Sequence, residues 1–119
     1  MKDTTFPEKA AELARRRRDL APETLRAFRS FSNQVFREGA VPRNVKELIA
    51  VAVAHVTQCP YCIEAHSRRA RQHGVSDAEL MEAIWVAAEM RAGAAYAHSL
   101  IALRATSQSE DNGSSKPND

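Results

Sequence analysis

The sequence lacks several features that would assign it to a class at once. No apolar run approaches the length of a membrane-spanning helix, since the longest covers only residues 48–54. Residues 1–5 do not contain the apolar stretch of a secretory signal peptide. We therefore expect a cytoplasmic protein without a membrane partner.

An excess of charge of one sign is also missing. The 17 Lys and Arg residues nearly balance the 15 Asp and Glu residues, which leaves a formal net charge of +2 at pH 7. This small excess gives no argument for a nucleic acid partner. The four arginines at residues 15–18 have no aromatic residues between them, and acidic residues flank them. We interpret this run as a solvated helix face or an interface.

Cysteine is scarce, and its placement is informative. Both cysteines belong to the segment Cys59-Pro60-Tyr61-Cys62. In the reducing cytosol, such a pair is more often catalytic or metal-binding than a permanent disulfide. His66 follows four residues after Cys62, and spacings of three and four place side chains on one face of a helix. Two thiols beside a proton acceptor are the layout of a thiol redox site.

The same segment is expected to begin a helix. Pro60 suits the first helical turn, which places Cys59 near the N-cap and Cys62 within that turn. Backbone N–H groups and the helix dipole at this end favour a thiolate over a thiol. His66 is placed to remove the proton of Cys62 or, once charged, to stabilise its anion. We therefore expect Cys62 to be the nucleophile.

The residue pattern before position 106 is helical and predicts an all-α bundle of about six helices. The length of 119 residues suits one domain, which we place at residues 1–105. Residues 106–119 are rich in Ser, Asn and Asp, and we expect them to form a disordered tail. The expected helices run from Pro7 to about Leu20, from Pro22 to Gly39, from Pro42 to about Thr57, from Pro60 to Gly74, from Ser76 to an interruption at Gly93, and from there to about Ala105.

Two of these helices carry further expectations. The body of the third, residues 48–54, is apolar on all sides and should be buried. Ser76 and Glu79 form a capping box at the beginning of the fifth. Five side chains of the fifth helix are expected to face the core: Leu80, Met81, Ile84, Trp85 and Ala88.

Glu47 is a carboxylate in the first turns of the otherwise apolar third helix. A buried charge of this kind needs a partner or a raised pKa. If the third and fourth helices form an antiparallel hairpin, Glu47 lies about 15 Å and His66 about 9 Å above the connecting loop. Glu47 would then orient and charge His66, directly or through one water. The alternative is a solvent-facing glutamate paired with Lys46 or Arg43.

Four residues agree in type and spacing with the core motif of alkylhydroperoxidase D (AhpD)-like proteins, which belong to the carboxymuconolactone decarboxylase superfamily: Glu47, Cys59, Cys62 and His66. The resemblance covers about residues 42–103. It implies an all-helical AhpD-like fold that assembles into homotrimers or homohexamers. It also implies that Glu47 tunes His66, that His66 activates Cys62, and that Cys59 resolves oxidised Cys62 to a disulfide.

The resemblance implies a thiol-dependent peroxidase that reduces alkyl hydroperoxides without a metal or other cofactor. A dithiol reductant, such as a lipoyl protein or a peroxiredoxin system, would then restore the two thiols. We expect Cys59 to react with this external dithiol, since the first cysteine of such a motif is usually the more exposed. Tyr61 occupies a position that is histidine in some members, so a proton relay there is missing or altered.

Three other interpretations stay open. His55, Cys59, Cys62 and His66 supply ligands that suit tetrahedral zinc, although none comes from a distant segment. His55 also suits a structural role, because a cation at the end of a helix complements the dipole. Decarboxylation of a cyclic lactone acid, the other activity of the superfamily, has no need of a cysteine pair. A non-catalytic redox sensor would use the disulfide as a switch.

Overall fold

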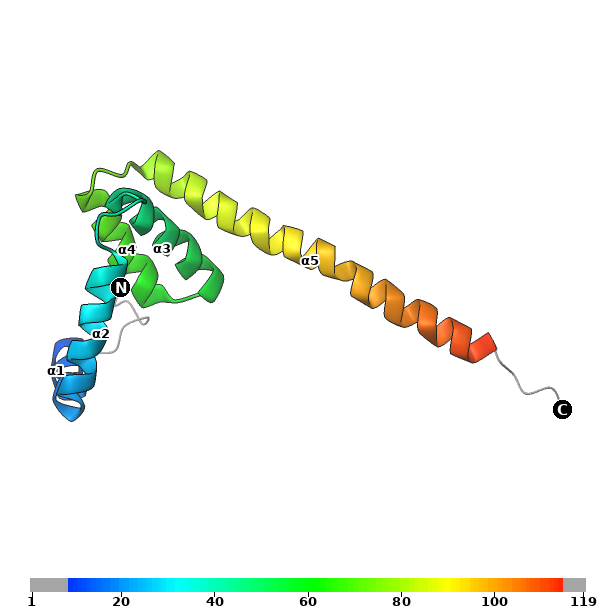
Figure 1. Cartoon of the computed structure of the whole chain (residues 1–119), viewed down its shortest axis with the longest axis horizontal. Coiled ribbons are helices and arrows are strands. Elements are labelled where there is room, and N and C mark those ends of the chain that lie inside the picture. The colour runs from blue at the N-terminus through cyan, green and yellow to red at the C-terminus, as the bar shows by residue number, and fades with distance from the viewer. Residues whose placement is uncertain (1–8, 115–119) are drawn as a thin grey trace.

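The protein is all-α, as the sequence predicts. The computed structural model describes the backbone of residues 9–114 and the side chains of residues 9–108, and no strand occurs in this part of the chain. Five helices follow one another along it (Figure 1): α1 (Ala10–Leu20), α2 (Pro22–Val35), α3 (Arg43–Thr57), α4 (Pro60–Gln72) and α5 (Asp77–Ser114).

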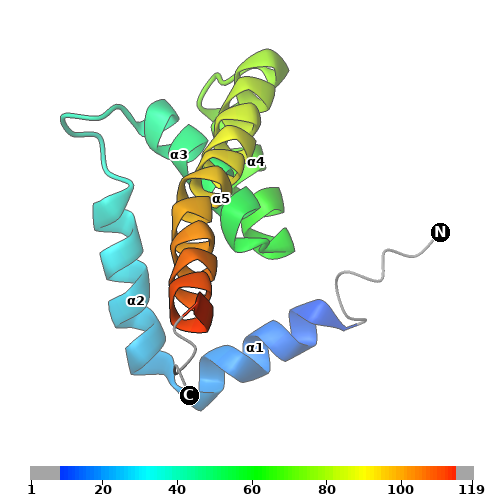
Figure 2. The ribbon, with the colours of Figure 1, turned by 90° about the vertical axis from the view of Figure 1, so that its right-hand side faces the viewer.

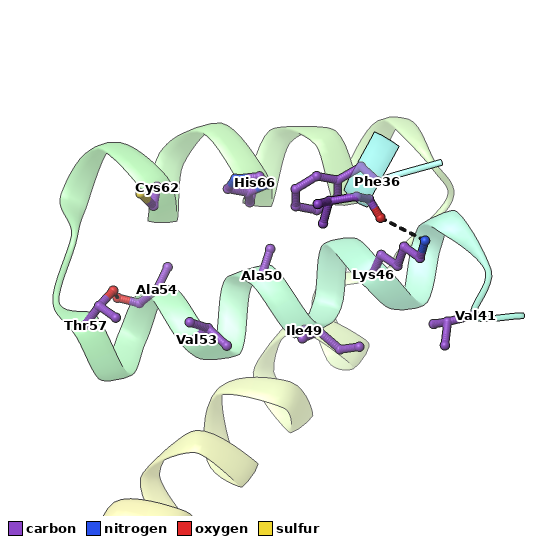
Figure 3. A pocket seen from close by; sticks show the side chains of 11 residues that line it. Phe36, Val41, Lys46, Ile49, Ala50, Val53, Ala54, Thr57, Cys62 and His66 are labelled. Carbon is purple, nitrogen blue, oxygen red and sulfur yellow. Dashed lines mark hydrogen bonds between the residues drawn. The ribbon is translucent and has the colours of Figure 1, made fainter. Parts of the chain in front are cut away.

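The core lies where α3 packs against both α4 and α5. The side chains buried there are mostly small, which lets the helices approach closely: Val51, Ala54, Ala70, Val75 and Ala87. Gln58 ends α3 in the left-handed conformation, with φ 59°, and the next residue already caps α4. This two-residue connection makes α3 and α4 an antiparallel hairpin, as Figure 3 shows.

The helices α1 and α2 contact each other and lie to one side of the core (Figure 2). The end of α2 is held over the beginning of α3 by Lys46, whose Nζ donates to the carbonyl oxygens of Val35 and Arg37 at 2.8 and 2.6 Å. The backbone N–H of Arg43 donates to Glu38 Oε2 at 2.9 Å. The helix α2 therefore ends at Val35, before the Gly39 stop that the sequence suggests.

The predicted interruption at Gly93 is wrong, because α5 continues without a break from Asp77 to Ser114. A glycine inside a helix costs only about 1 kcal/mol relative to alanine, and the alanine-rich surroundings favour the helix. The described residues therefore form five helices where about six were expected. The helix also enters the segment expected to be a disordered tail, and residues 115–119 lie outside the described part of the chain.

The capping box at the beginning of α5 is confirmed. The Ser76 N–H donates to Glu79 Oε1 at 3.0 Å, and the Glu79 N–H donates to Ser76 Oγ at 3.2 Å. The Ser76 N–H, and after it the Ser76 side chain, hold the pKa of the Glu79 carboxyl below its usual value. The two hydrogen bonds fix the point at which the long helix begins.

The expected inward face of α5 is correct only in part. Leu80 and Ile84 are half-buried, but Met81 and Trp85 are exposed, the latter at 68%. Ala87 is buried in place of Ala88. The face of α5 that packs on α3 is therefore shifted by about one position from the predicted face. The sequence pattern does not distinguish the two faces, because both sides of this helix carry apolar residues.

The expected burial of α3 is also correct only in part. Val51 and Ala54 are buried, whereas Ile49 and Val53 are about half exposed, at 51% and 52%. Two helices, α4 and α5, cover α3 within this chain, which leaves one apolar face uncovered. No helix among the described residues is long and apolar enough to cross a membrane.

Candidate functional site

The two cysteines stand at the first turn of α4, where the sequence places them. Cys59 is the N-cap residue and Pro60 occupies the first helical position. The Cys62 N–H donates to Cys59 Sγ at 3.3 Å, and the two sulfur atoms lie 2.7 Å apart. Both residues are free thiols and are half-buried. Because the sulfurs already touch, oxidation to a disulfide needs little movement of the backbone.

The two thiols differ in acidity. The pKa of Cys59 is lowered, first by a hydrogen bond from the Cys62 side chain and then by the Cys62 backbone N–H. The pKa of Cys62 is raised, since its thiol bonds to Cys59, lies in a partly desolvated place and feels the Cys59 charge. The thiolate that is expected at this helix N-terminus is therefore favoured on Cys59 in the resting dithiol, and the role of Cys62 as the nucleophile stays a prediction. The N-cap position stabilises the anion on Cys59.

Glu47 and His66 are in direct contact, which decides between the two interpretations of the glutamate. Glu47 is completely buried, and its Oε2 lies 2.8 Å from His66 Nδ1. Its other oxygen, Oε1, accepts a hydrogen bond from Arg43 Nε at 3.3 Å. The alternative partner Arg43 is thus present as well, while Lys46 bonds elsewhere. A buried carboxylate between two donors has the compensation that its burial requires.

This contact assigns the tautomer of the histidine. A carboxylate only accepts hydrogen bonds, so we place a proton on His66 Nδ1. In the neutral ring, Nε2 is then the acceptor that is left for a reacting proton. His66 and Cys62 both line the pocket shown in Figure 3, and they project from successive turns of α4 towards α3. The arrangement is that of a proton acceptor with a carboxylate behind it.

Phe36, at the end of α2, is a part of the site that sequence reasoning does not assign. Its ring stacks on the His66 ring with centroids 5.1 Å apart and an interplanar angle of 21°. The guanidinium of Arg43 lies over the Phe36 ring, 5.8 Å from its centroid. Phe36 belongs to an apolar stripe of helical period, so the sequence gives a signal for burial and none for a contact with His66.

An open apolar pocket of about 440 Å³ leads to the thiols (Figure 3). Apart from Cys62 and His66, its wall is mainly aliphatic and comes from α3 and the end of α2. The other lining residues are Val35, Phe36, Val41, Lys46, Ile49, Ala50, Val53, Ala54 and Thr57. Cys59 does not line this pocket. A substrate that enters here therefore meets Cys62 first, although Cys59 is the more acidic thiol.

The zinc interpretation finds no support in the geometry. Across the described residues, no three His, Cys, Asp or Glu side chains are grouped so that they could hold a metal ion. His55 Nδ1 lies 2.7 Å from the Val51 carbonyl oxygen of its own helix. This backbone contact gives His55 the structural role that its position at the end of α3 suggests.

Comparison with known sequences identifies relatives in several bacteria. The pattern of the carboxymuconolactone decarboxylase family matches residues 22–105. Protein 4 of the cox locus of Paracoccus denitrificans is 53% identical over 103 residues, which covers 87% of this chain and 92% of that protein. A protein of Haemophilus influenzae is 40% identical over 86 residues, which covers 72% of this chain and 76% of the relative.

Solved structures agree with this assignment. A carboxymuconolactone decarboxylase family protein from Legionella pneumophila is 32% identical, with a TM-score of 0.64 over 72% of this chain and 76% of that one. A family member from Thermotoga maritima, whose description suggests a link to an antioxidative response, is 25% identical, with a TM-score of 0.52 over 70% of this chain and 95% of the other. The chain belongs to the carboxymuconolactone decarboxylase family.

Proposed function

We propose that the protein is a thiol-dependent peroxidase that reduces alkyl hydroperoxides through a Cys59–Cys62 redox couple. The observation that carries this proposal is the 2.7 Å contact between the two sulfur atoms, beside the Glu47–His66 pair. The antioxidative context of the Thermotoga maritima relative supports it. Decarboxylation, the activity in the family's name, does not require two thiols in contact.

The first step forms the reactive thiolate. Cys62 lines the pocket together with His66, and its proton passes to Nε2 of His66, which leaves a Cys62 thiolate at the pocket wall. This thiolate attacks the terminal oxygen of the peroxide, and the O–O bond breaks. Cys62 becomes a sulfenic acid, and the departing alkoxide takes the proton that His66 received from Cys62 and leaves as an alcohol.

The second step closes the disulfide. The Cys59 sulfur attacks the sulfur of the Cys62 sulfenic acid, and the hydroxyl group leaves as water with the Cys59 proton. The peroxide has then gained two electrons, and the two thiols have lost two. An external dithiol returns these electrons by exchange through a mixed disulfide. We further propose that these reactions occur in the cytoplasm in a homotrimer or homohexamer, with a lipoyl protein or a peroxiredoxin system as redox partner.

Titration of free thiols tests this function. Metal-stripped and as-purified protein would be treated with one equivalent of cumene hydroperoxide, and thiols would be counted before and after. We expect both thiols of each chain to disappear, to return on treatment with dihydrolipoamide, and to behave alike in the two preparations. Peroxide consumption by Cys62→Ser at the wild-type rate would defeat the proposal. Thiols that react only after a chelator is added would indicate a metal site instead.

A further inference from the structure

A second pocket, next to the redox site, is lined by three arginines. Its volume is about 340 Å³, and we call it the arginine pocket. Its lining residues come from α2, α3 and α4 and include no acidic side chain: Arg29, Ser32, Asn33, Phe36, Arg43 and Arg69. Among the side chains of residues 9–108, Arg43 is the one of these three arginines that pairs with a carboxylate, that of Glu47. The pocket therefore carries an excess of positive charge.

Arg29 and Arg69 have no carboxylate partner among the side chains that the structure describes, which are those of residues 9–108. Other arginines of α4 are paired, since Arg68 contacts Glu64 and Arg71 contacts Asp77. An unpaired guanidinium offers a planar set of donors that matches a carboxylate or a phosphate. Arg29 and Arg69 face the same pocket from α2 and α4, so a single anion can be held between the two helices.

A third pocket connects the arginine pocket to the thiols. Its volume is about 530 Å³, and we call it the connecting pocket. It shares Arg29 and Arg69 with the arginine pocket, and it shares Cys62 and His66 with the pocket of Figure 3. The remaining wall is mainly aromatic and aliphatic: Leu25, Phe28, Phe31, Ser32, Val35, Phe36, Tyr61 and Ala65. An apolar surface thus runs from the reactive sulfur to the unpaired arginines.

We infer that the substrate is an amphipathic hydroperoxide with a terminal carboxylate, an inference that rests on the proposed peroxidase function. Its peroxide group lies at Cys62, its hydrocarbon chain lies in the connecting pocket, and Arg29 and Arg69 bind its carboxylate. A volume of about 530 Å³ is within the range of pockets that enclose small organic ligands. Oxidised fatty acids have this combination of a chain, a peroxide and a distant anion. Reduction leaves the carboxylate unchanged and yields the corresponding hydroxy acid.

Binding of the reaction product tests the pocket without requiring turnover. Isothermal titration calorimetry would compare the 9-hydroxy derivative of linoleic acid with its methyl ester, below the concentration at which either aggregates. We expect the wild type to bind the acid about tenfold more tightly than the ester, because a charge-assisted pair is lost in the ester. The Arg29→Gln/Arg69→Gln variant should bind the two equally. Arg68→Gln is the matched control, because Arg68 lines neither pocket and should retain the preference.

Thiol oxidation by the corresponding hydroperoxides, again as acid and methyl ester, gives a second test. We expect kcat/KM for the acid to exceed that for the ester about tenfold in the wild type and in Arg68→Gln, and the ratio to fall to about one in the double variant. Equal binding of acid and ester by the wild type, or a preference that survives in the double variant, would overturn the inference. Selective binding without any oxidation would instead refute the peroxidase function and leave the anion pocket in place.

Discussion

His66 Nδ1 lies 2.8 Å from Glu47 Oε2, and this contact joins the first turns of α3 to the middle of α4. Glu47 is completely buried, so water does not screen its charge from the ring. A buried carboxylate behind an imidazole stabilises the protonated ring and fixes its tautomer. The contact gives His66 the orientation that it needs to accept a proton at Nε2 and to pass it to a departing alkoxide.

Replacement of Glu47 by Gln should slow peroxide reduction by about tenfold or more. The amide can still accept a hydrogen bond from His66, but it carries no charge that would stabilise the protonated ring. Stopped-flow measurement of thiol oxidation by cumene hydroperoxide would record this effect. Glu64→Gln is the matched control, since Glu64 is a half-exposed carboxylate on α4 that pairs with Arg68. Equal rates for Glu47→Gln and the wild type would remove Glu47 from the mechanism.

Replacement of Phe36 by Leu should also slow thiol oxidation, by about three- to tenfold, because an aromatic stack contributes about 1 kcal/mol to the position of a ring. The substitution removes the 5.1 Å stacking contact and keeps the hydrogen bond between His66 and Glu47. The control is Trp85→Leu, because the Trp85 side chain is 68% exposed and lines none of the three pockets. If the two variants react at the same rate, Phe36 does not position the histidine.

The acidity of the two cysteines predicts a particular dependence on pH. The thiolate is the form that reacts with iodoacetamide. Because the pKa of Cys59 is lowered, its alkylation rate should reach a plateau at a lower pH than the alkylation rate of an ordinary cysteine does. Cys62, with its raised pKa, should react with iodoacetamide only at higher pH. Mass spectrometry of the alkylated peptides across a pH series would separate the two curves. Cys62→Ala removes the thiol donor, so the pKa of Cys59 should rise towards its usual value, and a curve that does not move would contradict this assignment.

The placement of the two thiols could be predicted from the sequence because it is local. Cys59, Pro60 and Cys62 lie within one helical turn, so their spacing alone places the thiols together at a helix N-terminus. The Glu47–His66 contact could be stated only as one of two alternatives, since it depends on how two helices align. The contact of Phe36 with His66 could not be predicted, because a chain reversal between α2 and α3 brings Phe36 over the ring.

The limits of helix prediction are visible at Gly93 and Trp85. Glycine permits a break but does not impose one, and the alanines around Gly93 keep the helix intact. Trp85 lies one position from a buried stripe on a helix that is apolar on more than one side. The periodicity of such a helix does not distinguish the face that packs within the chain from the face that packs elsewhere. The helix break predicted at Gly93 and the inward position predicted for Trp85 both depend on packing between helices, which the local sequence does not specify.

The outer part of α5 predicts self-association. Every described side chain from residue 88 to residue 108 is exposed, including many apolar ones. The large apolar residues exposed in this part are Met90, Tyr96, Leu100, Ile101 and Leu103. Monomeric proteins rarely expose a continuous apolar surface of more than a few hundred Å². We therefore predict that a second copy of the chain covers this surface, in keeping with a homotrimer or homohexamer.

Sedimentation velocity at micromolar concentration would measure this assembly. We expect the wild type to sediment with three or six times the chain mass of 13.2 kDa. Leu100→Glu should shift the population towards monomer, because a carboxylate buried in an apolar interface without a partner costs several kcal/mol. Gln108→Glu introduces the same charge at an exposed polar position of α5 and should leave the assembly intact. A wild-type protein that sediments as a 13.2 kDa monomer would contradict the prediction, since the apolar surface of α5 would then face water.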